Sequence, residues 1–255
     1  MTIDGAFRAR VLAREFLAGF WLNLGSSVTA EMAGLAGFDW VLLDHEHGPG
    51  SDSTILHQLQ AVSATPAACL VRVAANEPPR FKRVLDAGAH GVMVPYVSTA
   101  DEARAAVRAL RYPPHGMRGV AKLTRASSFG ARFDDYFAHA HEWLVTLTQI
   151  ETTDALDNAA EIAAVDGVDV LFVGPMDLTT SMGISGQYDD ARFHDALGEV
   201  ADAAREHGKA AGILLLDPAN LPLCRELGYT VVALGSDGGA VQAGLGRSLA
   251  ALTGR

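Results

Sequence analysis

Short apolar runs alternate with longer amphipathic stretches from one end of the chain to the other. The apolar runs occupy residues 19–24, 40–44, 68–73, 91–97, 144–150, 168–173, 211–216 and 230–234. Their nearly continuous apolar character is typical of strands in a parallel sheet that is covered on both faces. The pattern therefore predicts a parallel sheet of eight strands.

Helical periodicity fills the stretches between these strands. The clearest predicted helices span residues 27–36, 53–63, 78–87, 99–110 and 154–164. Gly37, Gly88, Gly208 and Gly228 each follow a helical stretch and lead into the next strand. Glycine is the common residue at such helix ends because it tolerates a left-handed backbone.

The alternation of strands and helices predicts a single domain, residues 1–255, folded as a (β/α)8 TIM barrel. Barrels of this type take about 250 residues. An open, doubly wound sheet is the alternative, but no Gly-x-Gly-x-x-Gly motif follows the first strand. The one long irregular stretch, residues 112–137, is expected to be functional or to lie in an interface.

Composition narrows the class of protein. A formal net charge of −10 argues against nucleic acid or an anionic membrane as the main partner, although a local site can still bind a small anion. Cys69 and Cys224 fall in an apolar run and a helical pattern, so a disulfide is not expected. No stretch approaches the ~20 apolar residues of a membrane span. We therefore expect a cytoplasmic protein.

Polar residues gather where the predicted strands end, which is where barrels of this type carry their active sites. The second strand closes with Asp44, His45, Glu46 and His47. Because strand side chains alternate, Asp44 and Glu46 share one face if the strand extends that far. Four ionisable groups at one strand end indicate a bound cation or substrate, and a solvated polar loop is the alternative.

An arginine, Arg72, interrupts the third apolar run. A buried arginine needs a partner, and its planar fork suits a carboxylate. The residue alone leaves two interpretations open: binding of an acidic substrate, or a structural ion pair with an acid of the barrel.

The ends of the fifth and sixth strands carry further carboxylates. Gln149 and Glu151 share one face of the fifth strand, and Asp177 follows the sixth strand. Glu151 and Asp177 come from adjacent strand ends and could chelate one ion, and their hard oxygens favour Mg²⁺, Mn²⁺ or Co²⁺. For Asp177 alone, a helix N-cap is the alternative.

The lysines exclude one kind of carbonyl chemistry. The chain has only Lys82, Lys122 and Lys209, and none follows a predicted strand, where a Schiff-base lysine would be needed. Carbonyl chemistry would therefore require a metal as Lewis acid. No Gly-x-Ser-x-Gly motif suggests a serine hydrolase.

Six motifs in order carry a resemblance to a known family. They are Asp44-x-Glu46-His47-Gly48-Pro49, Val71-Arg72-Val73, Leu85-Asp86-Ala87-Gly88-Ala89, Tyr112-Pro113-Pro114-x-Gly116-x-Arg118-Gly119, Gln149-Ile150-Glu151-Thr152 and Gly174-Pro175-x-Asp177-Leu178. The chain resembles, over essentially its whole length, the HpcH/HpaI family of class II pyruvate aldolases, which includes aldolases for 4-hydroxy-2-oxoheptanedioate and 2-dehydro-3-deoxyglucarate.

The resemblance implies a TIM barrel that assembles as a homohexamer, a trimer of dimers. It implies Glu151 and Asp177 as metal ligands with Gln149 beside them, and substrate contacts from Arg72 and from the backbone at Met176 and Asp177. It also implies His47 as the catalytic base, paired with Asp86. Asp44 and Glu46 would hold water molecules bound to the metal.

Asp86 raises a geometric question, because the helix that contains it ends at the opposite end of the barrel from His47. We therefore expect Asp86 to reach His47 of a neighbouring subunit. The loop residues Lys122 and Arg125 are candidates for binding the acceptor aldehyde across the same interface.

The resemblance implies reversible cleavage of 4-hydroxy-2-oxo acids to pyruvate, or a related 2-oxo acid, and an aldehyde. The alternative within the same chemistry is an acyl-CoA lyase of the malyl-CoA type. A non-catalytic barrel that binds 2-oxo acids is a further alternative, but such a protein should lack His47 or a metal carboxylate.

Overall fold

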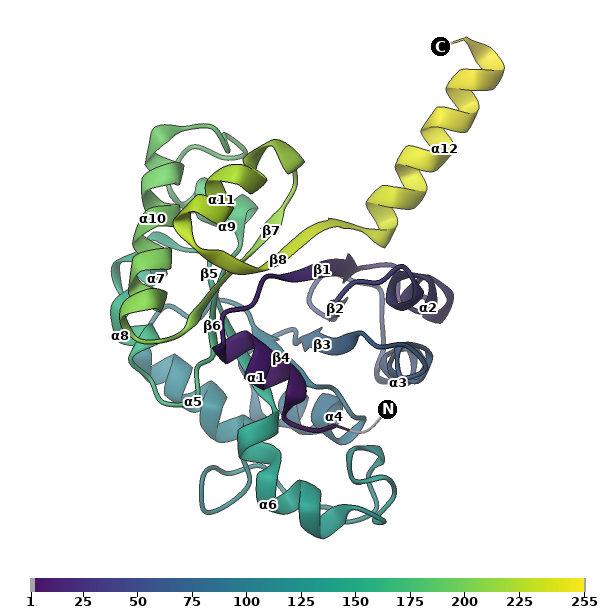
Figure 1. The fold of residues 1–255 in the computed structure, drawn as a ribbon, viewed down its shortest axis with the longest axis vertical. Helices are drawn as coiled ribbons and strands as arrows, with labels where there is room; N and C mark the ends of the chain where they lie inside the picture. The colour runs from purple at the N-terminus through teal and green to yellow at the C-terminus, as the bar shows by residue number, and fades with distance from the viewer. Residues whose placement is uncertain (1–2, 255) are drawn as a thin grey trace.

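The computed structural model describes residues 3–254 and has the predicted architecture, a closed barrel of eight parallel strands in the order β1 to β8 (Figure 1). The strands are β1 (Leu17–Leu22), β2 (Trp40–Asp44), β3 (Ala68–Arg72), β4 (Gly91–Val94), β5 (Val145–Ile150), β6 (Val170–Val173), β7 (Ala210–Leu215) and β8 (Tyr229–Ser236). The pairing of β1 with β8, which aligns Leu17 with Val231, closes the barrel.

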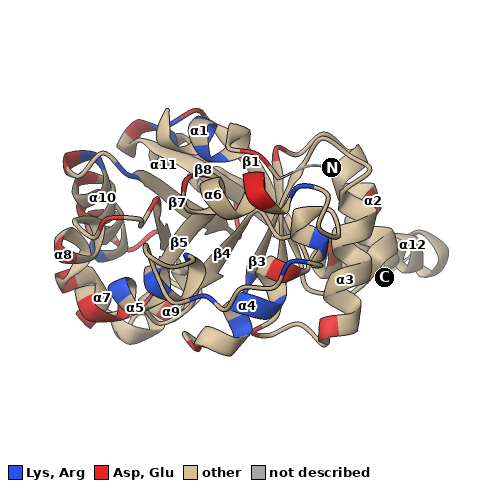
Figure 2. Cartoon of the chain, turned by 90° about the horizontal axis from the view of Figure 1, so that it is seen from below, with Lys and Arg blue, Asp and Glu red and all other residues tan. Residues whose placement is uncertain are grey.

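Helices surround the barrel. They are α1 (Ala6–Leu12), α2 (Ser27–Leu35), α3 (Asp52–Val62), α4 (Pro78–Asp86), α5 (Ala100–Leu110), α6 (Phe133–Trp143), α7 (Thr153–Asp157), α8 (Ala159–Ala163), α9 (Pro175–Ser181), α10 (Ala191–Glu206), α11 (Leu221–Leu227) and α12 (Asp237–Thr253), with short 3-10 turns η1 (Arg125–Ser127) and η2 (Pro218–Asn220). Acidic and basic residues are interspersed on the outer helices (Figure 2).

Two predicted segments differ in detail. The predicted helix 154–164 is divided at Asn158 into α7 and α8. The stretch 112–137 is not wholly irregular, because it contains η1 and the first turns of α6. Both cysteines are buried and free, as expected.

The interior of the barrel is a packed core of large side chains. Trp40 and Phe172 meet edge to face inside it, with ring centroids 6.2 Å apart. Gly19 makes room for Trp40, because a Cβ on this residue would lie 2.1 Å from the indole ring. Side chains therefore fill the barrel interior, and the site forms at the end of the strands.

Helix α1 covers the N-terminal end of the barrel. Phe7 and Val11 on this helix pack into the interior core, and Arg8 forms an ion pair with the buried Asp169 at 2.8 Å. The carboxyl ends of the strands point the other way, toward the loops that hold the candidate residues.

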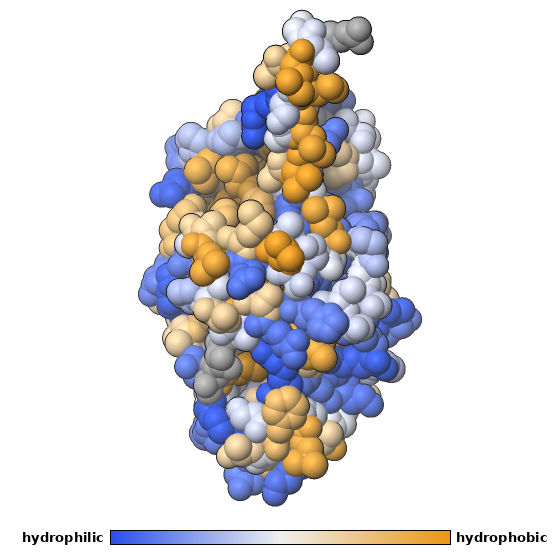
Figure 3. Space-filling model, turned by 90° about the vertical axis from the view of Figure 1, so that its right-hand side faces the viewer, coloured by the Kyte–Doolittle hydropathy of each residue, from blue (hydrophilic) through white to orange (hydrophobic). Residues whose placement is uncertain are grey.

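Helix α12 stands away from the barrel (Figure 1). Of its residues only Asp237, at its start, is buried. Its exposed apolar residues form one stripe, which the space-filling view shows (Figure 3): Val241, Leu245, Leu249 and Leu252. Within residues 3–254, no helix combines the length and the apolar character needed to cross a membrane.

Candidate active site

A buried ion cluster links the ends of β2 and β3. The register of the two strands places Arg72 beside Asp44. The guanidinium of Arg72 donates from Nε and Nη2 to the two oxygens of Asp44, at 3.0 and 2.6 Å. Its Nη1 lies 2.8 Å from Glu46 Oε2, at ion-pair distance but without hydrogen-bond geometry. Arg72 thus has the barrel acids as partners, one of the two interpretations that its position leaves open.

Trp21 of β1 completes this cluster. Its indole Nε1 donates to Asp44 Oδ2 at 3.2 Å, and the guanidinium of Arg72 lies 5.0 Å from its ring centroid. Burial by itself raises the pKa of Asp44, but the hydrogen bonds and charge of Arg72 outweigh it, so the pKa is lowered. For Glu46 burial outweighs the attraction of Arg72, and the pKa of this carboxyl is raised.

Glu151 follows β5 as a buried carboxylate, and no basic side chain of residues 3–254 forms an ion pair with it. It accepts hydrogen bonds from the backbone N–H of Tyr96 at 2.7 Å and from Gln149 Nε2 at 2.9 Å. Burial raises its pKa to about 7; the Tyr96 hydrogen bond opposes the rise, and the charges of Glu46 and Asp177 add to it. The carboxylates of the site therefore outnumber its one cation, the guanidinium of Arg72.

Asp177 lies in the first turn of α9, but it does not cap that helix. The N-cap residue is Gly174, and no side chain caps the helix. Gly174 also allows Glu151 to approach, because a Cβ on this glycine would lie 2.6 Å from Glu151 Oε2. The carboxylate of Asp177 is thus left for the cavity that it lines.

One cavity of about 270 Å³ brings most of the candidate residues together. Its polar wall contains His47, Arg72, Gln149 and Asp177. The side chain of His47 is 68% exposed, with Nε2 4.0 Å from Glu46 Oε2, so its ring can meet a ligand in the cavity. The volume is near the lower end of the range for small-molecule sites, about 300–1,000 Å³.

The donor atoms of this cavity fit a hard divalent cation. Gln149 Oε1 is buried and has no hydrogen-bond partner among the described residues. Oxygen atoms of carboxylates and amides are the ligands that Mg²⁺ and Mn²⁺ prefer. Residues 3–254 form no cluster of three or more His, Cys, Asp or Glu suited to a metal, so an ion here would rely on Glu151 and Asp177 together with substrate or water oxygens.

Asp44, Glu46 and Glu151 contact residues that line this cavity. Three other expected residues lie away from it. Asp86, at the end of α4, forms an ion pair with Arg118 at 2.6 Å, and no contact joins it to His47 within residues 3–254. Lys122 lies over the ring of Phe133 at 5.7 Å. Within one chain these residues do not join the cavity, so their roles across an interface stay predictions.

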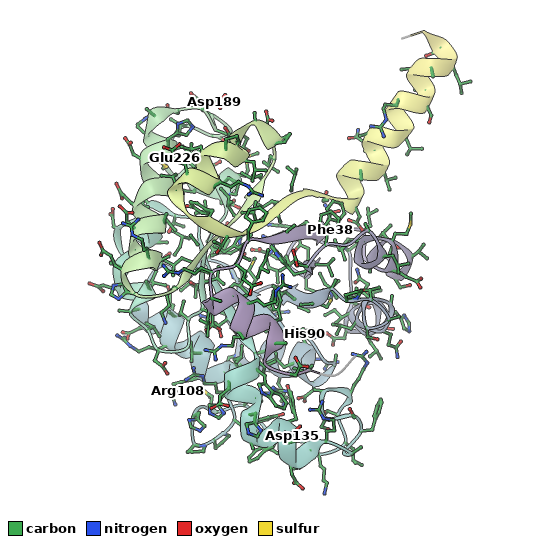
Figure 4. The ribbon with its side chains drawn as sticks, viewed as in Figure 1. Phe38, His90, Arg108, Asp135, Asp189 and Glu226 are labelled. Carbon is green, nitrogen blue, oxygen red and sulfur yellow. The ribbon has the colours of Figure 1, made fainter. Side chains whose placement is uncertain are left out.

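Arg125, the third of them, lines a different cavity, of about 210 Å³, with the buried His90 (labelled in Figure 4). Its Nη1 donates to the carbonyl of Ala87 at 2.9 Å. Its guanidinium therefore faces the α4 side of the molecule in this chain.

Sequence patterns did not indicate Tyr96 as a site residue. Its backbone has φ +52°, in the left-handed region that bulky residues rarely adopt, and this conformation directs its N–H at Glu151. Trp21 was also missed, although its position in an inward-facing register of the first strand was a usable signal. No short stretch of sequence could have indicated Tyr96, because a tyrosine in the sequence does not reveal that its backbone is left-handed.

Comparisons with known proteins identify the family to which the sequence is similar. Residues 17–243 match the model of the family described as HpcH/HpaI aldolase/citrate lyase. The chain is 42% identical to a 5-keto-4-deoxy-D-glucarate aldolase of Salmonella paratyphi A, covering 93% of this chain and 92% of that protein. It is 41% identical to a 4-hydroxy-2-oxo-heptane-1,7-dioate aldolase of Escherichia coli, covering 92% and 90%.

A solved structure has the same fold as this chain. An HpcH/HpaI aldolase/citrate lyase family protein from Burkholderia cenocepacia J2315 superposes with a TM-score of 0.92 at 37% identity, covering 98% of this chain and 99% of that one. The resemblance in the sequence motifs is confirmed, and so is the expected class of enzyme, a lyase. The chain belongs to the HpcH/HpaI aldolase/citrate lyase family.

Proposed function

We propose that this protein catalyses the reversible, metal-dependent cleavage of 4-hydroxy-2-oxo acids to pyruvate, or a related 2-oxo acid, and an aldehyde. The observation that carries the proposal is one cavity where His47, Arg72, Gln149 and Asp177 meet, next to the buried Glu151. The names of the relatives, both aldolases, support it.

Glu151 and Asp177 are the residues that would hold the divalent ion, Mg²⁺, Mn²⁺ or Co²⁺. A divalent ion at this place supplies Lewis-acid polarisation of the 2-oxo group and stabilises the negative charge that develops on its oxygen. Gln149 keeps the Glu151 carboxylate in place through the hydrogen bond from its Nε2. Gln149 Oε1, which has no hydrogen-bond partner within residues 3–254, is left to accept from a ligand.

Arg72 adds fixed positive charge to the same wall. Its guanidinium is held by Asp44 and by the face of Trp21, so it does not have to reorganise when substrate binds. We assign it the binding of the 2-oxo acid oxygens. The bidentate bond to Asp44 sets the plane of the guanidinium, which a lysine could not reproduce.

His47 is the residue that would move the proton. In cleavage the C4 hydroxyl loses its proton to His47 while the C3–C4 bond breaks, and its electron pair passes to C3. The proton then returns to C3 to complete the methyl group of pyruvate. Histidine suits this exchange because it gains and loses a proton near neutral pH.

The first experiment follows loss of the pyruvate methyl signal by NMR in D2O. Samples contain the purified protein with EDTA, or with EDTA followed by excess Mn²⁺ and a prompt quench. Exchange that stops with chelator and returns with metal supports the enolate half-reaction without knowledge of the aldehyde. Absence of exchange with every metal would contradict the proposal, and acyl-CoA donors would be tested next.

We further propose that the protein assembles with copies of itself, as a hexamer located in the cytoplasm. The support is the uncovered apolar stripe of α12, together with the exposed Val28, Met32 and Leu35 on α2. Beside these, Phe20 of β1 stacks at 4.9 Å on Phe38, which is labelled near the start of α12 in Figure 4. Large exposed apolar patches usually mark protein–protein contacts.

Light scattering after gel filtration tests the assembly. The wild type should have several times the chain mass of 26.8 kDa. Leu245→Asp, in the stripe, should shift the mass toward that of a smaller species, whereas the exposed Gln242→Asp on the same helix should not. A wild-type mass of one chain would contradict this proposal.

A further inference from the structure

The sequence motif that begins at Tyr112 holds one fully buried cation, Arg118. The guanidinium lies over the ring of Tyr112, 4.4 Å from its centroid, and donates from Nη1 to the hydroxyl of Tyr136 at 3.1 Å. The backbone N–H of Arg118 donates to the carbonyl of Arg111 at 2.9 Å. A Cβ on Gly116 would lie 2.4 Å from the same carbonyl oxygen, so the turn requires glycine. The motif therefore fixes the position of this guanidinium.

The carboxylate beside Arg118 belongs to Asp86, at the end of α4. Arg118 Nη2 donates to Asp86 Oδ1 at 2.6 Å. The Nε of Arg118 is buried and has no hydrogen-bond partner within residues 3–254. A buried guanidinium with one unsatisfied donor is a poor solution for stability alone. The pair therefore indicates a functional demand on Asp86.

Asp86 is the exposed member of this pair, with 22% of its side chain accessible. Its Oδ2 accepts no hydrogen bond from the described residues and is not buried, so it is open to a donor from outside the chain. A carboxylate that is held in this way can orient an imidazole through its N–H, as the aspartate of a catalytic triad does.

We propose that Arg118 is a positioning residue: it fixes Asp86 at the surface of one copy of the chain so that Oδ2 meets the imidazole of His47 in a second copy. The inference rests on the proposed aldolase function and on the predicted contact between subunits. Arg118 also supplies the countercharge that Asp86 needs beside the neighbour's cavity, where carboxylates outnumber the guanidinium of Arg72.

The rate of deuterium exchange into the pyruvate methyl group, measured with Mn²⁺, tests this role. Arg118→Met should lower kcat by at least about tenfold, a part of the about 100-fold or more that a positioned general base contributes. KM for pyruvate and the affinity for Mn²⁺ should stay within about twofold of the wild type, because Arg118 contacts neither ligand. Arg8→Met, which breaks an ion pair with the buried Asp169, is the matched control and should leave kcat unchanged.

Mixed assemblies test whether Arg118 acts across the contact between subunits. Arg118→Met and His47→Ala chains are co-expressed with different affinity tags, and assemblies that carry both tags are purified. About a quarter of their sites should be active, because random pairing joins an intact His47 to an intact Arg118–Asp86 pair in that share. His47→Ala with Asp177→Asn is the matched control and should stay inactive, because both residues line the cavity of one chain.

An Arg118→Met assembly with the kcat of the wild type would overturn the positioning role but leave the aldolase function standing. Loss of exchange that the mixed assembly does not restore would also overturn it. If Arg118→Met does not assemble, Arg118→Lys takes its place: it keeps the charge without the planar fork, so exchange should be at least about threefold slower and restored in the same mixture. A lysine variant as fast as the wild type would overturn the role. Wild-type protein without metal-dependent exchange would overturn both this inference and the proposed function.

Discussion

The replacement of Arg72 by methionine tests whether the ion cluster is a structural element of the site. The variant keeps most of the side-chain length and apolar stem but removes the charge. Asp44 and Glu46 then stay at the barrel end without a cation, since Arg72 is the basic group that contacts both. Breaking a buried ion pair from one side costs about 3–5 kcal/mol.

The lower end of this range applies here, because Asp44 keeps three donors. Trp21 Nε1 and the backbone N–H groups of Glu46 and His47 still bond to it. We therefore expect a loss of about 3 kcal/mol in the free energy of unfolding at pH 7. For a chain of this size that corresponds to a fall in Tm of about 6–12 °C.

The loss should depend on pH. The folded protein holds the pKa of Asp44 below its ordinary value, so the stabilisation from the pair is fully present above about pH 4 and is lost as the pH falls through the lowered pKa. In the variant, burial without Arg72 should raise that pKa, so protonation relieves the buried charge. The difference between wild type and variant should therefore be largest near pH 7 and smaller near pH 3.

The assay is urea unfolding of the metal-free protein at equal protein concentrations, followed by fluorescence of the buried Trp21 and Trp40. Arg80→Met, which removes an exposed ion pair with Glu77, is the matched control and should cost less than about 1 kcal/mol. Adding Asp44→Asn to Arg72→Met should recover part of the loss. A cost below about 1 kcal/mol for Arg72→Met, or a difference that does not change with pH, would refute this reasoning.

Three further predictions concern the metal ligands and the subunit contact. The pKa of Glu151 is raised to about 7, so the folded protein holds a proton that the unfolded chain releases near pH 4.3. Metal-free protein should therefore lose up to about 4 kcal/mol of stability as the pH rises between these values. Glu151→Gln should flatten this slope in urea titrations. Gly174→Ala should weaken Mn²⁺ binding by at least about tenfold in calorimetry, because the new methyl group collides with Glu151 Oε2. Gly198→Ala, where a Cβ meets nothing within 4 Å, is the control and should leave the Mn²⁺ affinity unchanged. Equal Mn²⁺ affinities of the two variants would exclude the collision. Asp86→Ala should abolish pyruvate exchange but retain Mn²⁺ binding, and a fully active variant, or an assembled structure with Asp86 far from every His47, would exclude the proposed contact between subunits.

The sequence by itself determined the barrel and indicated which polar residues lie at its strand ends. Eight apolar runs with helical stretches between them leave few topologies other than a closed parallel barrel, and the predicted starts of strands two, three and four agree with the structure. The carboxylates and Arg72 could be identified because a charged residue at the end of an apolar strand loses solvation free energy unless a partner or ligand compensates for it. Recognition of ordered motifs then named the family.

The tertiary structure alone decided which partners these residues have. Arg72 bonds to Asp44 because the β2–β3 register places them side by side, and Glu151 accepts from Tyr96 because that residue has a left-handed backbone. It also placed Asp86 against Arg118 and left α12 without a covering surface in one chain. A short stretch of sequence shows which residues are apolar or charged. Contacts between residues distant in sequence depend instead on strand register, barrel closure and backbone dihedrals, and no short stretch of sequence specifies these.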